Sequence, residues 1–132
     1  MPDPIAPQEG RARYPASDWM DHERNYKDAV GDLNLNPQEQ YLYRHHLENL
    51  KAGGLRASGP EGPVSTLRAM TTQIGDRVYT LPTVWDNKQL SPEESVKRAK
   101  KVGLDKFPSY SDDYQANQRY HKMHEYIDRD VR

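Results

Sequence analysis

Two histidines and a glutamate near the C-terminus are the residues whose types and spacing could do chemistry. His121, His124 and Glu125 lie at positions i, i+3 and i+4 of a predicted helix, with Asp128 at i+7. Two imidazoles one turn apart and a carboxylate could hold zinc and leave one position open. However, HKMHE is neither the H-E-x-x-H nor the H-x-x-E-H pattern of zinc proteases. His124 also borders the apolar face of the helix, so a metal-dependent hydrolase is an alternative and not the main hypothesis.

Other catalytic patterns find no support in the sequence. His45 and His46 are adjacent, so they point to different faces of a helix and cannot coordinate one metal ion together. There is no G-x-S-x-G turn, and the chain has no cysteine for thiolate chemistry. The Gly53-Gly54 pair follows a predicted helix, where it is typical of a helix end and not of a phosphate-binding loop. The sequence therefore predicts a protein that is not an enzyme and uses no cofactor.

Charge and hydropathy restrict the classes of partner. The 132 residues carry 19 basic and 20 acidic side chains, for a formal net charge of −1. Such a balance creates no overall field to attract nucleic acid or an anionic membrane. No apolar run reaches membrane-spanning length, and the N-terminus lacks the apolar core of a signal peptide. We therefore expect a soluble protein with protein partners, no membrane contact and no nucleic acid.

The chain is organised around a predicted β-hairpin. Ser65–Ile74 is rich in β-branched residues and ends at Gly75-Asp76, a turn pair in which glycine can take a positive φ. Arg77–Trp85 then alternates between two faces, as a strand does. Pro82 cannot donate a ladder hydrogen bond, so this strand should lie at an edge or be interrupted there.

Helix signals surround the hairpin. Asn36 with Pro37 and Glu39, and Ser91 with Pro92 and Glu94, are predicted capping boxes with proline at the first helical position. The predicted helices are residues 36–51, residues 92–102 and a last helix from Ser111, whose expected buried face is Ala116, Tyr120, Met123 and Ile127. The predicted fold is α+β: a small α-β-β-α-α domain over residues 36–132, with a β-hairpin and an extended, proline-rich N-terminal arm over residues 1–35.

Three aromatic residues and one methionine are the candidate partner contacts. A short helix is predicted over Ser17–Val30, and Trp19, Met20 and Tyr26 on it could anchor the arm to a partner. The alternative is that Trp19 folds back onto the core of its own chain. Trp85 ends the second strand, where it either closes the core against the final helix or forms an exposed interface anchor.

Several segments together resemble a small domain of tailed-bacteriophage proteins. They are NPQEQYLYRHHLENL with its double glycine, VSTLRAM, YTLPTVWDNK, LSPEE, GLDKFPSY and RYHKMHEYIDRD, and they span about residues 36–130. That family is largely without assigned chemistry, so the resemblance carries no catalytic residue to this chain. It implies a phage context and association with the virion.

These observations favour a non-enzymatic structural or accessory protein of a phage particle. It would be made in the host cytoplasm and located in the virion, where several copies bind other virion proteins in a symmetric assembly. A phage protein that binds a host protein is the first alternative. A hydrolase that uses His121, His124 and Glu125 is the second. The position in the particle, whether head, neck or tail, stays open.

Overall fold

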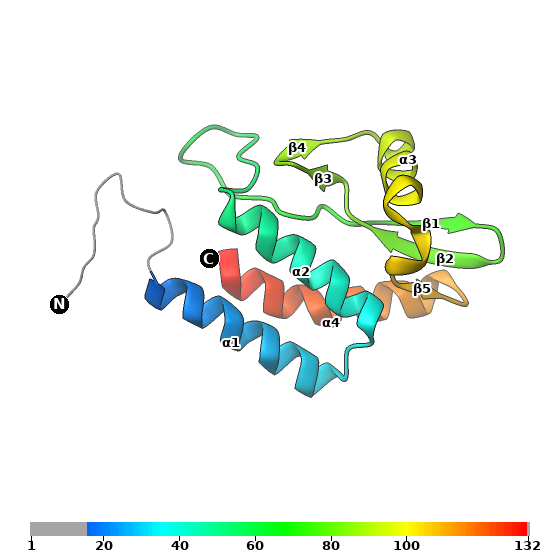
Figure 1. The fold of residues 1–132 in the computed structure, drawn as a ribbon, viewed down its shortest axis with the longest axis horizontal. Coiled ribbons are helices and arrows are strands. Elements are labelled where there is room, and N and C mark those ends of the chain that lie inside the picture. The colour runs from blue at the N-terminus through cyan, green and yellow to red at the C-terminus, as the bar shows by residue number, and fades with distance from the viewer. Residues whose placement is uncertain (1–15, 132) are drawn as a thin grey trace.

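The computed structural model describes residues 16–131, with side chains from Trp19 onward (Figure 1). It confirms the α+β fold and its β-hairpin. Four α-helices, five short strands and one 3-10 helix follow one another in the order α1 Ala16–Leu33, α2 Pro37–Lys51, β1 Met70–Ile74, β2 Arg77–Leu81, β3 Val84–Trp85, β4 Lys88–Gln89, α3 Pro92–Val102, η1 Leu104–Lys106, β5 Ser109–Tyr110 and α4 Asp113–Val131.

Both predicted capping boxes are present. At the start of α2, the Glu39 backbone N–H donates to the Asn36 side chain at 2.8 Å, and the Asn36 N–H donates to the Glu39 carboxylate at 3.0 Å. Ser91 and Glu94 repeat this exchange at the start of α3. Each exchange satisfies two backbone donors that a helix start leaves without an intrahelical partner, so these starts are fixed by local sequence.

The strands form two small antiparallel sheets. Strand β2 lies between β1 and β5, and β3 pairs with β4. Gly75 turns the chain between β1 and β2 with a φ of 66°, while Asp86 and Asn87 turn it between β3 and β4 with φ values of 53° and 59°. Glycine, asparagine and aspartate tolerate these left-handed conformations best.

The predicted strand Arg77–Trp85 is interrupted, as Pro82 suggested. It divides into β2 and β3, which belong to different sheets. Pro82 has no backbone N–H, and the next two N–H groups, of Thr83 and Val84, donate to the Leu67 carbonyl instead of a ladder partner. The chain therefore leaves the first sheet at the proline and starts a second one.

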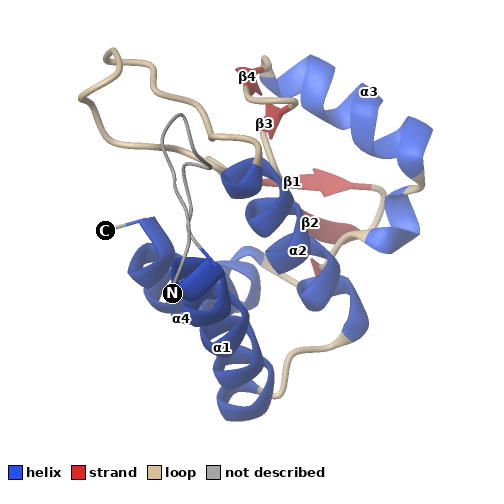
Figure 2. Ribbon diagram, turned by 60° about the vertical axis from the view of Figure 1, so that its left-hand side comes forward, coloured by secondary structure: helices blue, strands red, loops and turns tan. Residues whose placement is uncertain are grey.

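Helix α2 lies between the two larger of three parts of the core; the third consists of Val78, Tyr110 and Ala116. Helices α1, α2 and α4 pack together on one side, and the strands with α3 lie on the other (Figures 1 and 2). Side chains from the three helices form the first cluster, which includes Tyr26, Leu42, Tyr43, Leu47, Met123 and Ile127. The second cluster includes Leu81, Trp85, Ala99 and Phe107. Of the predicted inner face of α4, Ala116, Met123 and Ile127 are buried and Tyr120 is partly buried.

Helix α1 belongs to the domain, so the predicted boundary at residue 35 is wrong. Tyr26 and Ala29 are buried in the same cluster as residues of α2 and α4. The Tyr126 hydroxyl also donates to Asp32 at 2.6 Å, and Arg119 donates to the Leu33 carbonyl at 2.9 Å. The helix extends three residues beyond the predicted Val30 because its apolar face finds partners along its whole length. The rest of the predicted arm, residues 1–15, lies outside the described residues.

Two glycines differ in the space around their Cα atoms. Gly54, with a φ of 70°, has no room for a Cβ atom, which would overlap the Val64 side chain, whereas a Cβ on Gly31 in α1 would meet nothing within 4 Å. We expect Gly54→Ala to lower the free energy of unfolding by about 1–3 kcal/mol. Gly31→Ala should raise it by about 0.5–1 kcal/mol, because glycine weakens a helix interior. Urea denaturation measures both, and equal effects of the two substitutions would contradict this account.

Candidate functional site

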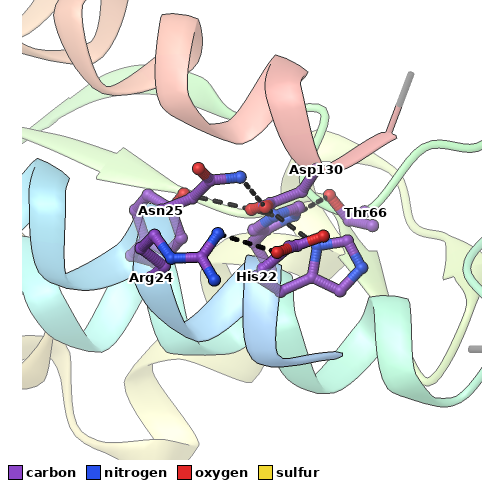
Figure 3. Close-up of polar contacts among 8 residues, drawn as sticks. His22, Arg24, Asn25, Thr66 and Asp130 are labelled. Atoms are coloured by element: carbon purple, nitrogen blue, oxygen red, sulfur yellow. Dashed lines mark hydrogen bonds and ion pairs between the residues drawn. The ribbon is translucent and has the colours of Figure 1, made fainter. Parts of the chain in front are cut away.

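The buried carboxylate of Asp130, near the end of α4, is the centre of a polar network (Figure 3). Its Oδ1 accepts from His22 Nδ1 at 2.9 Å and from Asn25 Nδ2 at 2.8 Å. Its Oδ2 accepts from His46 Nε2 at 2.8 Å and from the Tyr43 hydroxyl at 3.0 Å. A carboxylate offers about four acceptor positions, so all of them are used. We call these five residues the Asp130 network.

Helix periodicity brings these polar groups to one place. Asp130 shares the inner face of α4 with Met123 and Ile127, at spacings of seven and three residues. His46 lies on the inner face of α2, and His22 is one turn before Tyr26 on the inner face of α1. The network therefore lies within the contact of three helices, and each helix supplies at least one of its members.

The hydrogen bonds assign the tautomer of His46. An ionised Asp130 can only accept, so His46 Nε2 carries the proton and donates. The other ring nitrogen of a neutral imidazole is then an acceptor, and the Thr66 hydroxyl lies 2.6 Å from Nδ1. The result is a hydroxyl–imidazole–carboxylate series from Thr66 through His46 to Asp130.

This order of groups is the one that activates a hydroxyl nucleophile in hydrolases. Thr66 also lines a cavity of about 300 Å³ between α4 and residues 63–68. However, Thr66 is only 4% exposed, and its backbone carbonyl accepts a hydrogen bond from Asn49 Nδ2 at 2.7 Å. A substrate could reach the hydroxyl only if this segment moved, and Asp130 is already shared among three further donors. We therefore interpret the series as part of the packing.

Burial and hydrogen bonding set the ionisation of the network. Burial alone would raise the pKa of Asp130, but hydrogen bonds from His46, Asn25 and His22 more than offset this, and the pKa lies below its usual value. Burial lowers the pKa of His46, although its hydrogen bond to Asp130 acts in the opposite direction. A charged Asp130 and a neutral His46 at neutral pH agree with the tautomer assigned above.

The lowered pKa values predict a loss of stability in acid. The unfolded chain takes up a proton on His46 at a higher pH than the folded chain does, so the free energy of unfolding should begin to fall below about pH 6.5, the ordinary value for histidine. Asp130 adds a further loss around and below its ordinary value of 3.8. Urea denaturation between pH 8 and pH 3 measures this dependence.

A histidine variant assigns the first part of that dependence. His46→Gln should reduce the slope between pH 7 and pH 5, and the remaining slope should include His45, whose pKa is also lowered by burial. His121→Gln is the control because His121 is exposed on α4. A slope that His46→Gln leaves unchanged would contradict the role of His46.

A second buried carboxylate, Glu39, connects α2 to α4 and β5. Arg119 binds it with two hydrogen bonds of 2.8 and 2.9 Å, and the Tyr110 hydroxyl donates to it at 2.7 Å. Burial would raise the pKa of Glu39, but the hydrogen bonds from Arg119, Tyr110 and the Asn36 backbone lower it below its usual value. The carboxylate thus stays charged, caps its own helix and holds the start of α4.

The predicted anchors on α1 have different environments. Trp19 is partly buried, with its ring 5.4 Å from that of His22 and 5.6 Å from Lys51 Nζ, which follows the predicted alternative that it packs on its own chain. Met20 is 64% exposed. Tyr26 is only 7% exposed and lies in the core, so its prediction as a partner contact is wrong. Its ring packs on the Tyr43 ring, 5.3 Å away, because it shares the inner face of the helix with Ala29.

Trp85 is also a core residue, as the first of its two predicted alternatives has it, so its assignment as an exposed partner contact is wrong. Its Nε1 donates to the Pro82 carbonyl at 2.9 Å. The centre of its ring lies 4.7 Å from that of His45 on α2 and 6.1 Å from that of Phe107. The Arg98 guanidinium of α3 lies 5.0 Å from the ring centre. Trp85 thus closes the second cluster against α2 and α3, and not against the final helix.

The candidate metal ligands do not assemble into a centre. His121, His124 and Glu125 are exposed on α4. Among the side chains of residues 19–131, no group of three or more His, Cys, Asp or Glu is placed to hold a metal ion. The hydrolase alternative therefore has no metal site in this part of the chain.

Comparisons with known proteins give no family. No protein-family model, curated protein or solved structure matches the chain. In the part of the chain that the structure describes, no helix is long and apolar enough to cross a membrane.

Sequence reasoning missed Asp130 and its hydrogen bond with His46, and it assigned Glu39 only to a helix cap. Asp130 follows Ile127 by three residues, which places it on the inner face of α4, and His46 lies on the apolar stripe of α2. Buried polar groups need hydrogen-bond partners, so a charged residue on one buried face and a histidine on another could have indicated a contact between the two helices. The sequence gives no sign of which helices meet, so His22 and Arg119 could not be assigned as those partners.

Proposed function

We propose that this chain is a non-enzymatic structural or accessory protein of a bacteriophage particle that docks on other virion proteins. The proposal rests on one observation: the residues that carry the resemblance to the phage domain have structural roles in this fold. Asn36 and Glu39 cap α2, and Ser91 and Glu94 cap α3. Trp85 fills the core. These motif residues specify a scaffold, as expected of a domain that binds and does not catalyse.

The polar networks support the same proposal. Asp130 and Glu39 are the buried carboxylates of the described chain, and each is bound by donors from at least two other elements. A carboxylate used as a general base needs a free acceptor position facing the substrate. Here the acceptor positions are used to hold helices together, which suits a rigid part of a larger assembly.

The outer face of α1 is the proposed docking surface. Met20 is 64% exposed there, next to the partly buried Trp19. A flexible apolar side chain such as methionine adapts well to a partner surface. Residues 1–15 precede this helix and carry the prolines of the predicted arm, so in the proposal they continue the contact along a neighbouring subunit.

Copy number in purified particles tests this function. In particles of the phage that encodes the chain, quantitative mass spectrometry against the major capsid protein should find a fixed number of copies that matches a ring or lattice. The Met20→Asp variant is supplied to a phage from which the gene for this chain has been deleted. Its copy number in particles should be several-fold lower than that of the wild type, because the substitution places a charge in the contact. Lys100→Ala, at an exposed position of α3, is the control and should match the wild type.

Two outcomes would contradict the proposal. If the chain is absent from particles, the virion role is wrong, and binding to a host protein becomes the hypothesis to pursue. If Met20→Asp enters particles at the normal copy number, the protein can still be a virion component, but α1 is not its docking surface.

A further inference from the structure

A groove of about 560 Å³ lies where the end of α1, the start of α2 and the start of α4 meet. Its size falls in the range of about 300–1,000 Å³ that is usual for small-ligand sites. Its polar lining includes four amide residues, Asn34, Asn36, Gln115 and Gln118, together with Tyr114 and the paired Glu39 and Arg119. The groove is on a different part of α4 from the Asp130 network.

The floor of this groove is rigid and close to neutral. Arg119 is held by Glu39 through two hydrogen bonds and by the Leu33 carbonyl at 2.9 Å. The positive charge of Arg119 is thus balanced by a carboxylate that is 1% exposed. The lining contains no other charged residue than these two. A charged ligand would gain little here, so the groove favours an uncharged one.

Four side-chain amides supply hydrogen-bonding groups to the groove. Among the side chains of residues 19–131, the amides of Asn34 and Gln118 have no hydrogen bond to protein atoms; both residues are exposed and line the groove. Asn36 uses its Oδ1 for the helix cap and Gln115 uses its Oε1 for Ser111, which leaves an NH₂ group on each. Amides both donate and accept, as hydroxyl groups do, so this set matches a ligand with many hydroxyls.

Tyr114 supplies an exposed aromatic surface beside these amides. It is 73% exposed, although a tyrosine ring usually buries most of its apolar area. An exposed ring at the mouth of a polar groove can stack against the C–H face of a pyranose, while the amides bind the hydroxyls around it. An extended peptide also carries donors and acceptors, so peptides are the competing class of ligand in the test below.

We propose that this groove binds a neutral oligosaccharide, with Tyr114 as the stacking platform and the amides of Asn34 and Gln118 as ligands of the sugar hydroxyls. The paired Glu39 and Arg119 hold the walls of the groove in place. The site therefore adds recognition of a glycan to the docking role proposed above, and it stands whether or not the chain is a virion component.

A glycan array tests the proposal with the full chain. The probes are neutral oligomers of glucose, N-acetylglucosamine, galactose and mannose, and saturation-transfer NMR in solution follows for the best of them. Tyr114→Ala and Gln118→Ala should each weaken binding at least tenfold. Both positions are exposed, so the variants should keep the wild-type circular dichroism spectrum. Gln73→Ala, an exposed amide on the hairpin, is the control and should bind as the wild type does.

Three results would overturn the proposal: no neutral glycan bound, glycan binding that survives both groove substitutions, or binding of extended peptides in place of glycans on a parallel peptide array. Because the test measures binding by the isolated protein, its failure is separate from failure of the virion role, which copy number in particles decides.

Discussion

Asp130→Ala should lower the free energy of unfolding by about 3–5 kcal/mol, because it leaves four hydrogen-bond donors on two helices without their acceptor. The donors are His22 and Asn25 on α1, and Tyr43 and His46 on α2. Water cannot easily replace the carboxylate, since His22, Tyr43 and His46 are buried and Asn25 is half-buried. Urea denaturation followed by circular dichroism measures the loss.

The same substitution should loosen α1 more than the rest of the fold. Hydrogen exchange should show faster exchange of α1 amides in Asp130→Ala than of β1 and β2 amides, because His22 and Asn25 lose their partner on α4. Glu125→Gln, on the exposed side of the same helix, is the matched control and should change stability by less than about 0.5 kcal/mol. An Asp130→Ala protein as stable as this control would show that the network contributes nothing.

Glu39→Ala is the second substitution with a large expected effect, also about 3–5 kcal/mol. It removes the side-chain half of the α2 capping box and leaves Arg119 without its carboxylate. Tyr110, buried against Glu39, loses its acceptor as well. Urea denaturation measures the effect, with Glu48→Ala at an exposed position of α2 as the control.

A double-mutant cycle separates the ion pair from the helix cap. Arg119→Met removes the charge partner and keeps much of the side-chain volume. If the ion pair of Glu39 and Arg119 accounts for most of the lost stability, Glu39→Ala should lower the free energy of unfolding much less in the Arg119→Met protein than in the wild type. If the two substitutions add, the loss in Glu39→Ala comes from the cap and from Tyr110, and the assigned role of the pair is wrong.

The placement of the two networks bears on the proposed docking role. One fixes α1 against α2 and α4, and the other fixes the start of α4 against α2 and β5. The exposed Met20 and Tyr114 therefore project from helices whose positions are already set. A surface that is ordered before binding loses less conformational entropy on association.

Local sequence determined the ends and turns of this fold. The capping boxes at Asn36 and Ser91, the glycine turn at Gly75 and the interruption at Pro82 are all where the sequence predicts them. Each depends on atoms within about four residues of one another, or on a backbone property of one residue type. Such interactions can be read from a short stretch of sequence.

Tertiary structure decided what the buried polar and aromatic residues do. His22 and Asp130 are 108 residues apart, and Glu39 and Arg119 are 80 apart, so no local pattern links either pair. The same holds for Tyr26, whose burial depends on which helices α1 meets. Sequence periodicity indicates which face of a helix is buried, but the partner of that face is set by packing of the whole chain. For this reason the α+β class and its hairpin followed from the sequence, whereas the membership of α1 in the core and the Asp130 network did not.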